Sequence, residues 1–131
     1  MNSQVEFDAI TFRALLKTIP NPITRLDYLT SLKKTVTTTL MVSLTYVPDK
    51  LLLRPESFDT YLEVSAPRIL EPYELYAHSF AEDVNNEVVP RWLRIEIIME
   101  NASTRRIVVT DNQPKWSNPA LLASTLYAIP I

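Results

Sequence analysis

The stretch YELYAHSFAEDVNNEVVPRWL, residues 73–93, decides how the rest of the chain is organised. Its apolar side chains recur every three or four residues, the spacing of one face of an α-helix. Pro72 suits a first helical turn, and Pro90 ends the run because proline cannot continue a helix. The stretch therefore predicts an amphipathic helix that leads into a strand. Its core-facing stripe consists of Tyr73, Tyr76, Ala77, Phe80, Val84 and Val88.

A second face of the same helix carries ionisable side chains one turn apart. Glu74 and His78 are four residues apart, so we predict that they share this face, with Glu82 beyond them, and act as a general acid/base pair. The alternative is a solvated face with a weak ion pair. His78 is the only histidine in the chain. A three-histidine zinc site is therefore excluded, and we expect no metal.

Strand patterns lie on both sides of two helical segments. Residues 37–47 give the clearest strand, because apolar and polar side chains alternate along it, and residues 27–34 supply a partner for a hairpin. Further expected elements are an early helix at 7–17 closed by Pro20, an apolar return at 51–53, a helix at 55–64, a strand at 93–99, a turn at 101–103, a strand at 105–111 and a terminal helix at 118–127. The order predicts an α+β domain with two helices between strands 2 and 3 of a four-stranded antiparallel sheet.

Composition excludes several classes of function. We expect a single domain over residues 1–131, with residues 1–20 and 112–131 as terminal extensions. A net charge of −2 without clustered basic residues argues against nucleic acid as a partner. No apolar run is long enough to span a membrane, and the chain has no cysteine. We therefore expect a cytoplasmic protein without a disulfide framework or a thiolate nucleophile.

The chain also contains no glycine, where ordinary usage of about 7% predicts roughly nine. Every glycine-rich phosphate-binding loop is thereby excluded. Left-handed backbone positions should instead fall to asparagine and aspartate, which tolerate them best among the remaining residues. The candidates are Asp49, Asn85, Asn86, Asn101, Asp111 and Asn112.

Several short motifs, read in order, resemble the tunnelling-fold superfamily, and within it the nitrile reductases of queuosine biosynthesis. They are Asn21-Pro22, Asp27-Tyr28, Tyr46-Val47-Pro48-Asp49-Lys50, Ser57, Tyr61-Leu62, Glu74, Asp83 and Pro90-Arg91-Trp92-Leu93-Arg94. The resemblance covers about four-fifths of the chain. It implies a tunnelling fold whose sheets join into a barrel between subunits, with pockets at the subunit interfaces. It also implies that Glu74 anchors the N–H edge of a planar purine or pterin.

This chain departs from the reductase family where the family's chemistry resides. The family places a nucleophilic cysteine and an aspartate between its first strand and the Tyr-x-Pro-Asp strand. Only 17 residues separate Tyr28 from Tyr46 here, and they contain neither residue. A thioimide intermediate needs a thiolate, so nitrile reduction is not expected. Glu56 and Asp59 stand where the family has two lysines for a nicotinamide cofactor, and carboxylates would repel its phosphate. We therefore expect no cofactor.

Four further residues are candidates for ligand binding. Arg91 and Arg94 flank Trp92, an arrangement suited to stacking or to anion binding, and Tyr46 and Tyr61 offer phenol groups to a pocket. The alternatives are a core tryptophan with arginines that extend to solvent, and core tyrosines.

Two functional hypotheses follow, both with a symmetric homo-oligomer that binds a small molecule at subunit interfaces. The first is a repurposed, cofactor-independent enzyme of specialised biosynthesis, an isomerase, cyclase or lyase, in which Glu74 is the anchor or base and His78 its partner. The second is a non-catalytic ligand-binding or scaffold homologue. The missing glycines leave a third possibility open, an engineered or heavily reworked homologue.

Overall fold

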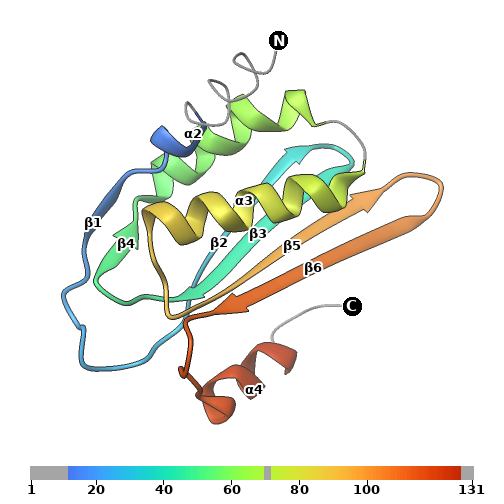
Figure 1. Ribbon diagram of the computed structural model, residues 1–131. Coiled ribbons are helices and arrows are strands. Elements are labelled where there is room, and N and C mark those ends of the chain that lie inside the picture. Colours follow the sequence, from blue (N-terminus) through green and yellow to red (C-terminus); the bar gives the residue numbers. More distant parts are fainter. Residues whose placement is uncertain (1–11, 70–71, 128–131) are drawn as a thin grey trace.

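The computed structural model describes residues 12–69 and 72–127 (Figure 1). The elements are β1 (Thr18–Pro20), β2 (Thr30–Thr37), β3 (Leu40–Val47), β4 (Leu51–Leu53), α2 (Pro55–Ser65), the 3-10 turn η1 (Ala66–Arg68), α3 (Tyr73–Glu87), β5 (Trp92–Glu100), β6 (Thr104–Asn112) and α4 (Pro119–Tyr127). Of the early helix expected at 7–17, residues 12–14 are helical, and residues 7–11 lie outside the described residues.

The main sheet has four antiparallel strands in the order β2-β3-β5-β6. Leu44 pairs with Leu32 on one side and with Ile95 on the other, and Ile95 pairs in turn with Val109. These four side chains share one face of the sheet, because the side chains of directly paired residues lie on the same side. The expected α+β class and the antiparallel sheet are confirmed.

Helices α2 and α3 contribute to one core with this apolar face of the sheet (Figure 1). Phe80 of α3 is fully buried, and its ring stacks on Tyr61 of α2 with 4.8 Å between the ring centres. The ring centre of Phe58, also in α2, lies 6.1 Å from the ring centre of Phe80. The periodic stripe of residues 73–88 therefore serves two partners, the sheet below it and the helix beside it. We call the other side of the sheet, turned away from α2 and α3, the distal face.

A second, two-stranded sheet was not expected from the sequence. β1 pairs with β4, so that Thr18 lies opposite Leu53. β1 falls where the sequence predicted the close of the early helix at Pro20. Strands of three residues carry too little periodicity to be recognised, and the pairing with a distant segment decides them. β2 also begins and ends three residues later than the strand expected at 27–34.

The left-handed positions were predicted wrongly. Among the described residues, positive φ angles occur at Val89 (51°) and Lys115 (68°), and at none of the six asparagines and aspartates. Val89 follows the end of α3, where helices commonly finish in a left-handed residue, and its amide donates to the Val84 carbonyl oxygen at 3.3 Å. Lys115 follows Pro114 in a turn closed by the Trp116 amide and the Gln113 carbonyl oxygen, 3.2 Å apart. At both residues the place in the local structure, a helix end or a turn, determines the positive φ angle, and the residue type does not.

Among the helices in the described part of the chain, none is both long enough and apolar enough to cross a membrane.

Candidate functional site

Glu74 lies in the first turn of α3, beside the edge strand β6. Its carboxylate forms an ion pair with Arg105 near the start of β6, and 54% of its side chain is exposed. Towards the C-terminal end of the same helix, Asn85 Nδ2 donates to Asp111 Oδ2 of β6 at 2.9 Å. Two side-chain contacts therefore hold α3 along the edge of the sheet. A hydrogen bond with its own backbone amide and a second one from Arg105 lower the pKa of Glu74, so it stays an ionised acceptor.

His78 lies one turn along α3 and has a different partner. Its Nε2 atom contacts the Glu82 carboxylate, and both side chains are more than half exposed. The helix thus places Glu74 and His78 on neighbouring turns, as the spacing predicted, while the contacts of the described residues join Glu74 to Arg105 and His78 to Glu82. The structure does not bring Glu74 and His78 together as a hydrogen-bonded pair.

Arg91 is the centre of a polar cluster at the end of the sheet where β3 ends and β5 begins. Its Nη1 atom is 3.0 Å from Asp27 Oδ1, and its Nη2 atom is 3.2 Å from Asp49 Oδ1. The same guanidinium donates to the carbonyl oxygens of Thr24 and Leu26, at 2.6 and 3.2 Å. With 17% of its side chain exposed, Arg91 uses its donors to hold the loop before β2.

The two carboxylates of this cluster also hold the C-terminal segment. Asp27 Oδ2 accepts from Asn118 Nδ2 at 3.0 Å and from Trp116 Nε1 at 3.3 Å. Asp49 Oδ2 accepts from Gln113 Nε2 at 3.0 Å. Hydrogen bonds from Asn118 first, and then from Arg91 and Trp116, lower the pKa of Asp27 against the opposing effect of burial. We call these six residues the Arg91 hub: Asp27, Asp49, Arg91, Gln113, Trp116 and Asn118.

The sequence pattern indicated no part in a functional site for Asp27 or Asp49, although both belong to the motifs that carried the resemblance. Asn21, another of those residues, donates to the Asp49 carbonyl oxygen at 2.7 Å and accepts from the Tyr28 hydroxyl at 2.7 Å. The signal that could have found the cluster is a proline beside each of Asn21, Asp49 and Arg91. Such prolines mark loops whose backbone is held in one conformation.

The two candidate tyrosines are buried, and both hydroxyls have partners within the protein. Tyr46 accepts from the Leu53 amide at 2.9 Å, which ties β3 to β4. Tyr61 donates to Asp83 Oδ2 at 2.6 Å, which ties α2 to α3. Burial raises the pKa of both phenols. The two groups contribute to packing between elements, in agreement with the alternative of core tyrosines.

Asp83, the partner of Tyr61, makes stability depend on pH. Burial raises the pKa of this carboxyl group, so the folded state holds the proton more tightly than the unfolded chain. The stabilisation is complete below the unfolded value and is lost as the pH rises through the raised folded value. Asp83→Asn keeps an acceptor for Tyr61 and has no such proton. We expect the stability of this variant, relative to the unmodified protein, to increase from pH ~3.5 to ~7 in urea unfolding. A relative stability independent of pH would contradict the assignment.

Arg94 lies on the distal face, in a charged group at the middle of the sheet. Its Nη2 atom is 3.7 Å from Glu96 Oε2, and Arg106 Nε is 2.7 Å from the same oxygen. The side chains of Arg94 and Glu96 are 14% and 11% exposed. Arg94 is therefore paired within the protein, and the carboxylate of Glu96 lies between two guanidinium groups.

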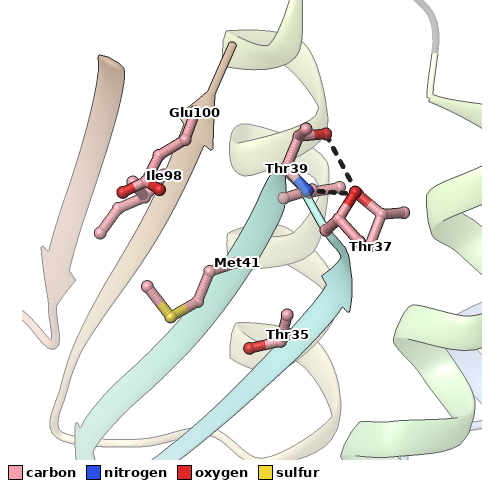
Figure 2. Close-up of a pocket in the computed structure, with 8 residues that line it drawn as sticks. Thr35, Thr37, Thr39, Met41, Ile98 and Glu100 are labelled. Carbon is pink, nitrogen blue, oxygen red and sulfur yellow. Dashed lines mark hydrogen bonds between the residues drawn. The ribbon is translucent and has the colours of Figure 1, made fainter.

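A pocket of about 140 Å³ lies elsewhere on the distal face, at the tip of the β2–β3 hairpin (Figure 2). Thr35, Thr37, Met41, Ile98 and Glu100 are among its lining residues. None of the six site residues predicted from the sequence lines this pocket. As for a metal ion, the described residues contain no group of three or more histidine, cysteine, aspartate or glutamate side chains suited to hold one.

Comparisons with known proteins identify the fold of the chain. No protein-family model matches the chain, and no curated protein is significantly similar to it. Among solved structures, the chain is similar to the crystal structure of the archaeosine synthase QueF-like in the apo form, with a TM-score of 0.50 and 16% sequence identity. The match covers 71% of this chain and 98% of that one. At this identity the likeness shows the fold alone. The chain has a QueF-like fold, which is the fold that the resemblance of its motifs implied.

Proposed function

We propose that this protein is a homo-oligomeric, non-catalytic binding protein whose ligand is a small planar nitrogen heterocycle anchored by Glu74. The observation that carries the proposal is the position of the Glu74 carboxylate, which is more than half exposed and is held by Arg105 at the edge strand β6. An ionised carboxylate accepts two parallel N–H donors, the pattern that a guanine-like edge presents. The resemblance to tunnelling-fold enzymes implies the same role for a carboxylate at this position.

The edges of the sheet support an assembly in which this position lies at a subunit boundary. β2 and β6 each pair on one side only among the described strands. Because the sheet has four antiparallel strands, its two edges run in opposite directions, and a ring of copies would pair β6 with β2 of the next copy in an antiparallel manner. Such pairing satisfies backbone groups that an edge strand leaves open. Glu74, in contact with β6, would then lie next to the neighbouring copy.

The electrostatics favour binding over acid–base catalysis by Glu74 and His78. A general base works best with a pKa near the working pH, whereas the pKa of Glu74 is lowered. His78 contacts Glu82 on the next turn of the helix, away from Arg105. Glu74 is therefore better suited to hold a ligand than to take a proton from it. For this reason we prefer the binding protein to the isomerase, cyclase or lyase that the sequence also permits.

The test compares two nucleosides that differ at one edge. Guanosine presents neighbouring N1–H and N2–H donors, and adenosine lacks this edge. We expect calorimetric titration to detect binding of guanosine and not of adenosine. We expect Glu74→Gln to weaken guanosine binding at least about tenfold, because one of the two carboxylate oxygens becomes an NH2 donor and the side chain no longer accepts two parallel N–H bonds. Native mass spectrometry of the same samples reads the subunit number.

Glu82→Gln is the matched control, since Glu82 is an exposed carboxylate on the same helix. It should bind guanosine as the unmodified protein does. Unchanged binding by Glu74→Gln, or equal binding of the two nucleosides, would contradict the role of Glu74. A closed oligomer that binds neither nucleoside would favour a scaffold protein instead, and conversion of bound guanosine would favour the enzyme.

A further inference from the structure

The pocket on the distal face is built from residues that the proposed function does not use. Strand β2 supplies two of its threonines, Thr35 and Thr37, and the turn between β2 and β3 supplies two more, Thr38 and Thr39. Glu100 reaches the same pocket from the end of β5. Figure 2 shows Thr35, Met41 and Ile98 on three successive strands. We call this the threonine pocket.

The base of the threonine pocket is apolar. Met41 and Ile98 are direct partners in the pairing of β3 with β5, and both are partly exposed. Their side chains stand on the distal face, where α2 and α3 do not cover them. Methyl and thioether groups at the base of a pocket attract an aliphatic part of a ligand by removing apolar surface from water.

The rim of the pocket is rich in hydrogen-bond acceptors. Thr37 Oγ1 accepts from the Thr39 amide at 3.2 Å and lies 3.3 Å from Thr39 Oγ1. Each threonine hydroxyl has two acceptor lone pairs, so this arrangement leaves capacity for a further donor. The threonine side chains present no charge, and their hydroxyl groups serve a ligand that brings N–H donors.

Glu100 gives the pocket a negative charge. Within the described residues its carboxylate takes part in no ion pair and no side-chain hydrogen bond, and its backbone amide donates to the Thr39 carbonyl oxygen at 2.8 Å. The arginines of the neighbouring strand are engaged elsewhere, Arg105 with Glu74 and Arg106 with Glu96. The Glu100 carboxylate therefore has no cationic partner among the described residues, and it lines the same pocket as the four threonines.

We propose that the threonine pocket binds a small primary alkylammonium ligand. The ammonium group would donate to Glu100 and to the threonine hydroxyls, and the short alkyl chain would lie on Met41 and Ile98. A volume of about 140 Å³ is close to that of a cavity which holds one benzene molecule, so the ligand has on the order of six heavy atoms. An anion would be repelled by Glu100, and a single carboxylate is a poor site for a divalent cation.

The probe for this site is n-butylammonium, with 1-butanol and butyrate as ligands of the same length that are neutral and negative. Methyl NMR spectra of the full chain report on Met41 and Ile98 directly. We expect n-butylammonium to shift both methyl signals in a saturable manner, and 1-butanol to do so about fivefold more weakly, since the exposed ion pair is lost. Butyrate should leave the signals unchanged.

Glu100→Gln tests the charge and should weaken n-butylammonium binding by a similar factor of about fivefold. Glu63→Gln is the matched control, because Glu63 is an exposed carboxylate on α2 whose ion pair is with Lys34. Equal affinity for n-butylammonium and 1-butanol would overturn the proposal, as would unchanged affinity in Glu100→Gln or an absence of saturable shifts. The result is independent of Glu74, which lies on the helix side of the sheet.

Discussion

Replacement of Arg91 by alanine is expected to lower the free energy of unfolding by about 3 kcal/mol, because it leaves two partly buried carboxylates without their cation. Asp27 and Asp49 would keep the hydrogen-bond donors of the C-terminal segment while losing the guanidinium at 3.0 and 3.2 Å. The carbonyl oxygens of Thr24 and Leu26 would lose a donor as well. Urea unfolding followed by circular dichroism measures the difference.

Arg54→Ala is the matched control for this experiment. Arg54 is 49% exposed and has one ion pair, with Glu56 at 3.5 Å. Exposed pairs of this kind contribute about 0–1 kcal/mol, so the control should unfold nearly as the unmodified protein does. If Arg91→Ala also lowered the free energy of unfolding by less than about 1 kcal/mol, Arg91 would not be important for stability. The hypothesis that it binds a ligand would then be favoured.

Replacement of Phe80 by alanine is the second large effect, with an expected loss of about 3–5 kcal/mol. The Phe80 ring is fully buried and touches Tyr61 and Phe58 of α2. Its removal opens a cavity at the point where α2, α3 and the sheet meet, and the lost contacts add to the lost transfer free energy. Urea unfolding measures the loss in the free energy of unfolding. If the dependence of this free energy on urea concentration is unchanged, the folded state of the variant stays compact.

Leu75→Ala on the same helix separates this packing effect from a change in helix propensity. Leu75 is 60% exposed, so its truncation should change stability by less than about 0.5 kcal/mol. A comparable loss in both variants would mean that the helix itself, and not its buried stripe, responds to truncation. Only a large loss confined to Phe80→Ala supports the core position predicted from the spacing of residues 73–88.

The strongly periodic parts of the fold were predictable, and the weakly periodic parts were not. Alternation predicted the strands around Leu44 and Ile95, and helical spacing predicted α3, because each pattern repeats over many residues. The apolar return expected at 51–53 is β4, but β1 and its pairing with β4 were not predicted, because three residues hold no repeat and the pairing joins segments far apart in the chain. The left-handed angle at Val89 was missed because the end of the helix imposes it on an unfavourable residue type.

The candidate site, too, was predictable only in its local features. The spacing placed Glu74 and His78 on neighbouring turns of α3, but it could not show that Arg105, from a strand thirty-one residues later, would be the partner of Glu74. The Arg91 hub joins loops near residues 27, 49, 91 and 118, and no local pattern indicates that these loops meet. The threonine pocket depends equally on the pairing of β3 with β5, which brings Ile98 and Glu100 beside the first hairpin.

By itself the sequence determined the fold class, the main strands and the buried stripe of α3, since these depend on residue type and local periodicity. Only the tertiary structure decided what each polar side chain does. Arg91 became internal because two carboxylates from distant loops surround it, while Glu74 stayed exposed because it lies at an edge of the sheet. The reason is physical: the partner of a charged group is set by proximity in space, which a linear pattern does not contain.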